Sequence, residues 1–127
     1  MTNKDERRKA QKLWAENKYL VLSKSHKCYL SIRKYLKNEE VKKEAVQVFI
    51  DKAVSLKESP KDIVNAYQHI WGYFKDKASI EERKEFLELL DQYKKAKLDK
   101  SVPLDYLKNL LKKYPNEYLE NSTIFND

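Results

Sequence analysis

Residues that interrupt helices are almost absent from this chain, which has one glycine and three prolines among 127 residues. Strong helix formers fill the stretches between them, and charged residues make up 37% of the chain. This composition favours an all-α fold. One domain of this length can bury a core without disulfides or a metal, so we expect a compact single-domain bundle spanning 1–127.

Capping residues and apolar periodicity divide the chain into about five helices. Residues 4–37 hold no glycine or proline and predict one long basic helix, or two nearly collinear ones. Later helix starts are indicated by Asn38, by Ser59-Pro60, by a capping box at Ser79, and by Val102-Pro103. The remaining predicted helices are 38–56, 59–77, 79–93 and 102–114, with a last turn near 117–119.

Apolar side chains at helical spacing indicate the buried face of each predicted helix. The arc of the first helix comprises Ala10, Trp14, Val21, Cys28, Ile32 and Tyr35. The second helix is expected to bury Val41, Ala45, Val48 and Phe49, with Lys52 extending to solvent, and the fourth Phe86, Leu87, Leu90 and Tyr93. The third helix is apolar around much of its circumference and should be central; it carries Ile63, Tyr67, Ile70 and Phe74.

The net charge of +7 is concentrated in the amino-terminal third. Residues 1–37 hold 11 Lys/Arg and 3 Asp/Glu, an excess of +8, whereas residues 38–92 hold 9 and 12, an excess of −3. A basic region suits a polyanion such as nucleic acid. An ordinary solvated, lysine-rich face is the other interpretation of the same residues.

If the first helix is continuous, cationic and ring-bearing residues form a strip along its outer side. The strip comprises Arg8, Lys12, Tyr19, His26, Arg33 and Lys37, with Lys9, Lys27 and Lys34 beside it. Such a strip can follow a phosphate backbone, while Tyr19 and His26 stack on unpaired bases. We therefore predict a nucleic-acid-binding surface on this helix.

A candidate pocket begins on the core side of the same helix, where Arg7, Trp14, Lys18 and Ser25 share the apolar arc. An unpaired buried lysine is costly. Lys18 must therefore find a carboxylate, reach solvent, or line a pocket that receives an anion.

The third predicted helix supplies the rest of this pocket, with Asn65, His69 and Gly72 on one face, Tyr73 at its edge and Lys75 after it. Glycine inside a helix costs about 1 kcal/mol relative to alanine, so Gly72 indicates close approach by another helix or a ligand. A lone helical histidine is commonly structural, and His69 is kept as a binding candidate.

The sequence favours neither a metal site nor a catalytic nucleophile. Cys28, the single cysteine, lies on the core arc, and His26 points to nearly the opposite side. There is no glycine-rich phosphate loop and no His-Glu-x-x-His motif. We expect no cofactor, no metal and no catalytic residue. No apolar stretch has the length of a membrane span, and we expect a soluble cytoplasmic protein.

Three segments resemble the YbgA-like domain of unknown function, a bacterial and archaeal family. They are 13–25, 69–75 and 82–119, the last with a Val-Pro-Leu step at 102–104 and a Tyr-Leu close at 118–119. The chain departs from the family pattern at 95–96, where the family has Arg and Gly, at 109–110, where it tends to place His, and in its carboxyl end, which lacks the family's Pro-containing tail. Family members occur alone or joined to a thiouracil desulfurase-like domain.

The resemblance implies a helper that presents thiolated RNA, in the first place tRNA, to a desulfurase. The expected function is that of a non-catalytic RNA-binding accessory domain, with a thiouracil desulfurase-like protein as partner. One alternative is a small enzyme or anion-binding protein that uses Lys18, His69 and Tyr73. Another is an adaptor whose exposed Trp71 and basic strip dock an acidic partner. The oligomeric state is left open.

Overall fold

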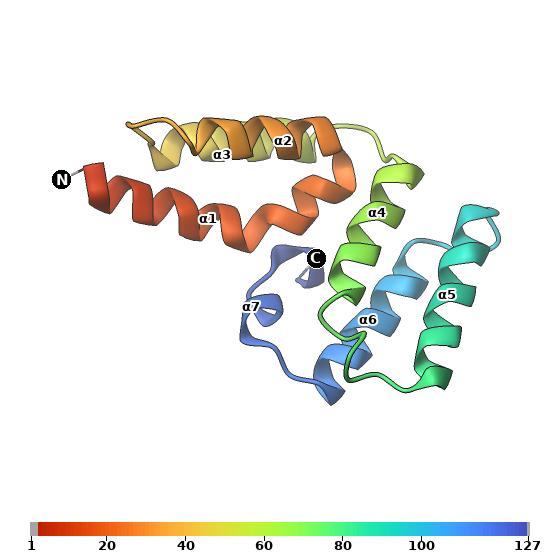
Figure 1. Ribbon diagram of the computed structural model, residues 1–127. Coiled ribbons are helices and arrows are strands. Elements are labelled where there is room, and N and C mark those ends of the chain that lie inside the picture. The colour runs from red at the N-terminus through yellow and green to blue at the C-terminus, as the bar shows by residue number, and fades with distance from the viewer. Residues whose placement is uncertain (1–2, 127) are drawn as a thin grey trace.

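The computed structural model describes residues 3–126, and within that range every regular element is helical (Figure 1). The elements are α1 (Asn3–Lys24), α2 (His26–Tyr35), α3 (Lys43–Val54), α4 (Pro60–Trp71), α5 (Ile80–Lys94), α6 (Ser101–Lys113), α7 (Glu117–Glu120) and the 3₁₀ helix η1 (Thr123–Phe125). The predicted all-α fold is confirmed, but these residues form seven α-helices rather than about five.

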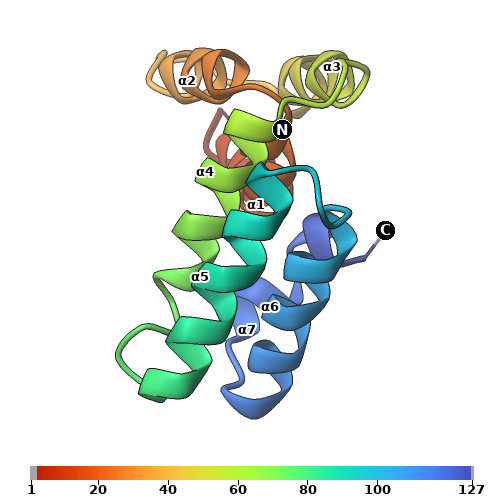
Figure 2. The same ribbon diagram turned by 90° about the vertical axis from the view of Figure 1, so that its right-hand side faces the viewer.

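The helices form two groups that meet at α4 (Figure 1). α2 and α3 lie side by side over α1 (Figure 2), and α1 packs against both α3 and α4. In the second group, α6 packs against α4 and α5, and the carboxyl end returns to α1 through η1. α4 is central, as predicted, because Ile63 and Ile70 on it and Phe74 just after it are all buried.

The first predicted helix is interrupted at Ser25. The backbone there is extended (φ −163°, ψ 114°), and the Ser25 hydroxyl accepts a hydrogen bond from the Cys28 N–H at 3.0 Å. A serine in this N-cap position satisfies one of the free N–H groups at the start of a new helix, here that of Cys28. α2 therefore folds back along α1 (Figure 1), and the prediction of one long helix or two collinear ones is wrong.

Two predicted helix starts are confirmed by their capping bonds. The Ser59 hydroxyl accepts from the Asp62 N–H at 3.4 Å, and Pro60 is the first residue of α4. At α5 the Ser79 hydroxyl accepts from the Glu82 N–H at 3.1 Å while the Glu82 carboxylate accepts from the Ser79 N–H at 2.8 Å. This reciprocal pair is a complete capping box.

The predicted start of the second helix at Asn38 is displaced to Lys43. Arg7 of α1 binds backbone carbonyls of residues 36, 38 and 39 and holds this segment as a loop. The buried face of α3 consequently contains Val46, Ile50 and Ala53, and Val48 is 67% exposed. In the fourth predicted helix Leu87 is likewise exposed instead of buried.

Glu82 also connects the start of α5 to the end of α6. Its carboxylate accepts hydrogen bonds from the Tyr114 hydroxyl at 2.7 Å and from Lys113 Nζ at 3.1 Å. The backbone hydrogen bond from Ser79, then those from Tyr114 and Lys113, lower the pKa of Glu82 from 4.5 to about 2.

Glu82→Gln is therefore expected to lower the melting temperature near neutral pH. A carboxyl group whose folded pKa is depressed stabilises the fold above its unfolded pKa, and this stabilisation is lost as the pH falls from 4.5 toward 2. The difference between the variant and the wild type should shrink over that range in melting curves followed by circular dichroism. Glu81→Gln, one residue earlier and exposed, is the control. An equal loss in both variants, or a difference independent of pH, would contradict this role.

Candidate functional site

The return of α2 along α1 places ring-bearing and cationic side chains of the two helices together. The Tyr29 ring lies 5.6 Å from Trp14 and stacks on His26 at 6.1 Å, measured between ring centroids. The guanidinium carbon of Arg33 lies 5.8 Å from the centre of the same ring, within cation–π range. His26 and Arg33 of the predicted strip thus join Trp14 of the predicted pocket.

Three tyrosines from distant parts of the chain form a cluster beside these residues. The hydroxyls of Tyr19 and Tyr73 are 2.8 Å apart and share a hydrogen bond. Tyr73 stacks on Tyr118, with centroids 6.1 Å apart and planes 15° apart, and Tyr19 meets both rings edge-on. Tyr19 is buried, whereas Tyr73 is 36% and Tyr118 is 37% exposed. The pair Tyr73 and Tyr118 therefore presents ring surface to solvent.

The tyrosine hydroxyls of the two sets of rings are near enough to influence one another electrostatically. Burial first, and then the nearby Tyr73 and Tyr29 hydroxyls, raise the pKa of Tyr118. Burial and the hydrogen bond to Tyr73 likewise raise the pKa of Tyr19 far above its ordinary value. These hydroxyls therefore stay neutral at physiological pH and can donate hydrogen bonds. We call Trp14, Tyr19, Tyr29, Tyr73 and Tyr118, together with His26, the aromatic surface.

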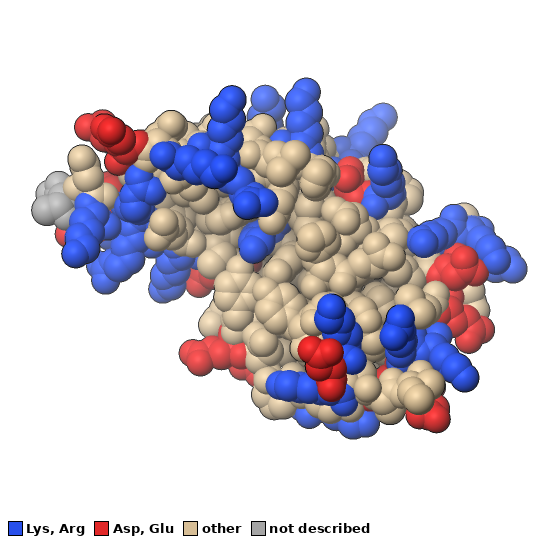
Figure 3. Space-filling view, in the orientation of Figure 1, with Lys and Arg blue, Asp and Glu red and all other residues tan. Residues whose placement is uncertain are grey.

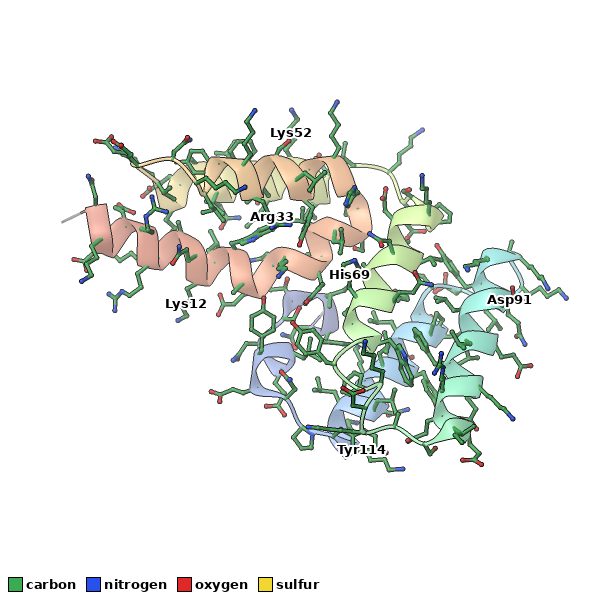
Figure 4. All side chains as sticks on the ribbon, viewed as in Figure 1. Lys12, Arg33, Lys52, His69, Asp91 and Tyr114 are labelled. Carbon is green, nitrogen blue, oxygen red and sulfur yellow. The ribbon has the colours of Figure 1, made fainter. Side chains whose placement is uncertain are left out.

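Two cations at this surface have no carboxylate partner within the part of the chain that the structure describes. Lys18 is half-buried, and its Nζ lies 5.6 Å from the centre of the Tyr19 ring. Burial first, and then the charge of Arg33, lower the pKa of Lys18. Among residues 3–126, neither Lys18 nor Arg33 forms a salt bridge. Figure 4 shows Arg33 between α2 and α1. Because Arg33 is exposed and Lys18 is only half-buried, both cations are accessible to an anion from outside the chain.

His69 lies on the side of α4 that faces α1 (Figure 4). On the same face of α4, about two helical turns earlier, Asp62 accepts a long hydrogen bond of 3.4 Å from the His26 backbone N–H. At the other end, Tyr73 in the turn after α4 bonds to Tyr19. The exposed His69 thus lies between the two ends of this face. Asn65, half-buried on the same helix, lines a separate groove, and Lys75 is exposed in the turn after α4.

Two residues of the predicted pocket serve the fold. The Arg7 guanidinium is occupied by backbone carbonyls, at 2.8 Å from Leu36 O and 3.2 Å from Glu39 O. The Ser25 hydroxyl caps α2. Both groups already have partners inside the chain, so the structure gives these two residues roles in the fold, and their assignment to the pocket stays a prediction.

Gly72 also has a different role from the predicted one. α4 ends at Trp71, and Gly72 is its C-cap with ordinary dihedral angles (φ −53°, ψ −26°). A Cβ added there would meet the His69 carbonyl oxygen at 3.0 Å, and the next nearest atoms also belong to residues 68 and 69. The glycine allows a tight turn within its own segment, so the predicted close approach of another helix is wrong.

The cations of the predicted strip are exposed but do not form one track. Arg8 and Lys12 lie on α1, whereas Lys27, Lys34 and Lys37 belong to α2 and the turn that follows it. Figure 3 shows Lys and Arg around the edges of one face, with uncharged side chains at its centre between the two groups of helices. Tyr19, predicted to stack on bases from this strip, is instead buried in the tyrosine cluster.

Sequence reasoning missed Tyr29 and Tyr118 as site residues. Tyr29 follows His26 by three residues, a spacing that places the two on one helical face and could have been used. For Tyr118 the sequence offers only the Tyr-Leu pair at 118–119, which does not indicate that this ring meets Tyr19 and Tyr73. Trp71, assigned to an adaptor surface, is half-buried and stacks on Phe86 at 5.0 Å, so it contributes to packing.

Within the described part of the chain, no three His, Cys, Asp or Glu side chains are grouped closely enough to hold a metal ion. The helices in that part of the chain also include none that is long and apolar enough to cross a membrane.

Comparisons with known proteins match most of the chain to one family. The family described as "Protein of unknown function (DUF1722)" matches residues 18–127. The "Uncharacterized protein YbgA" of Escherichia coli (strain K12) is 28% identical over 67 residues, which cover 53% of this chain and 40% of the relative. The match thus spans less than half the length of that curated relative. No solved structure matches the chain.

Proposed function

The chain belongs to the DUF1722 family of proteins of unknown function and is a YbgA-like domain, and from this premise we propose that it is an RNA-binding accessory domain. Its aromatic surface takes unpaired nucleotides, and the domain performs no chemistry itself. The observation that carries the proposal is the placement of two cations, Lys18 and Arg33, against the buried rings of Tyr19 and Tyr29. Among residues 3–126 neither cation forms a salt bridge, and Tyr19 in turn packs against the exposed rings of Tyr73 and Tyr118.

The two kinds of side chain suit the two parts of a nucleotide. Lys18 and Arg33 neutralise phosphate, and Arg33 can do so with two parallel hydrogen bonds. The exposed faces of Tyr73 and Tyr118 stack on bases that are not paired. A duplex keeps its bases stacked inside, so this surface favours single-stranded loops, bulges and ends.

The identity of the RNA follows from the resemblance alone. Because YbgA-like domains occur joined to a thiouracil desulfurase-like domain, we propose tRNA as the ligand and such a protein as the cytoplasmic partner. The domain would hold the RNA while the partner carries out desulfuration.

We expect the chain to bind tRNA in preference to duplex DNA of equal charge, and to retain that preference between about 50 and 200 mM salt. Stacking contacts weaken less with salt than phosphate contacts do, so the preference should grow as the salt rises. Fluorescence anisotropy at several salt concentrations measures both affinities. Equal binding that disappears with salt would reduce the interaction to non-specific electrostatics and refute the proposal.

The unpaired cations also favour a second candidate, a protein that binds a small anion. It predicts that inorganic phosphate competes with tRNA at low concentration and that the tyrosine rings contribute nothing. A Tyr73→Ala/Tyr118→Ala variant separates the two candidates, because only RNA binding requires the exposed rings.

A further inference from the structure

A groove of about 730 Å³ lies beside α4, separate from the aromatic surface except at His26. It lies where the first half of α4 passes between the α1–α2 corner and the end of α5 (Figure 1). Residues 60–68 of α4 form most of its wall, and Lys94 of α5 closes one side. Sites for small organic ligands commonly have this volume.

Two side-chain amides and two apolar residues suit the groove for a planar, polar ring. Asn65 and Gln68 are three residues apart on α4, which places them on one face. Among residues 3–126, neither side-chain amide makes a hydrogen bond to another group of the protein. An amide offers both donors and an acceptor and can pair with the edge of a base, while Pro60 and Val64 contact its face.

The charges at the groove suit a phosphate at its rim. Lys61 and Lys94 approach from two different helices, and within the described residues neither forms a salt bridge. The one carboxylate in the lining, that of Asp62, accepts the His26 N–H at 3.4 Å. The two positive charges of Lys61 and Lys94 exceed the one negative charge of Asp62. The groove therefore attracts an anion that also carries a polar ring.

We propose that this groove binds one nucleotide, with the edge of its base on Asn65 and Gln68 and its phosphate on Lys61 and Lys94. The inference rests on the lining of the groove and does not require the aromatic surface. From residue 61 to His69 the helix rises about 12 Å. A single RNA strand along α4 therefore reaches both the groove and Tyr73, and the groove would supply the base preference that stacking lacks.

Titration of the ¹⁵N-labelled chain with each of the four nucleoside 5′-monophosphates tests the proposal. We expect at least one of them to shift the side-chain amide signals of Asn65 and Gln68. An Asn65→Ala/Gln68→Ala variant should bind that nucleotide about 5-fold more weakly or worse. The matched control is Gln11→Ala/Gln47→Ala, which removes two exposed amides on α1 and α3 and should leave binding unchanged.

Inorganic phosphate and a third variant separate the possible outcomes. If phosphate alone produces the same shifts and the Asn65/Gln68 variant binds nucleotides normally, the groove is a simple anion site and the proposal is wrong. The absence of any shift at the groove overturns it as well. In the Lys18→Gln/Arg33→Gln variant the mononucleotide should still shift the side-chain amide signals of Asn65 and Gln68, because neither substituted residue lines the groove. If that variant keeps both mononucleotide and tRNA binding, the proposed role of the aromatic surface fails while the groove stands.

Discussion

Replacing both Lys18 and Arg33 with glutamine is expected to weaken tRNA binding roughly 100-fold at about 100 mM salt. The substitutions remove the two cations at the aromatic surface and introduce no repulsive charge. Lys18 is half-buried, so its interaction with a phosphate is less screened than that of an exposed lysine. Fluorescence anisotropy with labelled tRNA measures the loss.

A matched control removes the same charge elsewhere. Lys27→Gln/Lys34→Gln changes the net charge equally, and both residues are exposed on α2. Non-specific attraction would weaken by the same factor in both variants, whereas the proposal predicts less than about a 3-fold loss in the control. Equal losses would show that only the total charge matters, and unchanged affinity of the Lys18/Arg33 variant would exclude the aromatic surface as the binding site.

Stability should change in the opposite direction from affinity. Burial and the charge of Arg33 lower the pKa of Lys18 from 10.5, so the folded protein holds this proton less tightly than the unfolded chain does. The charged lysine therefore costs stability at neutral pH, and the cost disappears as the pH rises through the unfolded pKa of 10.5. Removing Lys18 should leave the melting temperature unchanged or higher. A residue that lowers stability and raises affinity is typical of a binding site.

Local signals in the sequence were sufficient for several helix starts and insufficient for the turn at Ser25. Ser59-Pro60 and the capping box of Ser79 combine a cap with a change in apolar periodicity, and both starts are confirmed. At Ser25 the apolar arc continues on either side of the cap, from Val21 to Ile32, at the spacing of a single helix. The break at Ser25 depends on the packing of α2 against the rest of the chain, which the local sequence pattern does not indicate.

The candidate site was predictable where its residues share one helix. Trp14 and Lys18 are four residues apart on α1, and the sequence alone places them on a common face. Arg33 reaches the same surface only because α2 folds back, and Tyr118 because α7 returns toward α1. Such contacts depend on tertiary packing across up to 99 residues, from Tyr19 to Tyr118, and periodicity carries no information about them.

Arg7 and Arg8 are neighbours at the start of α1 but have different surroundings. Comparing them distinguishes a contribution to the stability of the fold from a contribution to ligand binding. Arg7 donates hydrogen bonds to carbonyls at and after the end of α2, including Leu36 O at 2.8 Å, and so connects α1 to the α2–α3 loop. A cation at a helix carboxyl end also interacts favourably with the helix dipole. Arg8 is exposed, and its nearest carboxylate oxygen, of Asp5, is 4.0 Å away.

Arg7→Met is therefore expected to lower the free energy of unfolding by about 2 kcal/mol and the Tm by roughly 5–10 °C. Methionine keeps the apolar length of the side chain, so the loss reports the hydrogen bonds. Arg8→Met removes the same charge one residue away and should change the stability by less than about 0.5 kcal/mol. Urea denaturation gives both values, and tRNA affinity measured on the folded variants should be similar for the two. If Arg7→Met keeps its stability but binds tRNA much more weakly than Arg8→Met, Arg7 belongs to the binding site and its contacts with the α2–α3 loop are not what fixes this part of the fold.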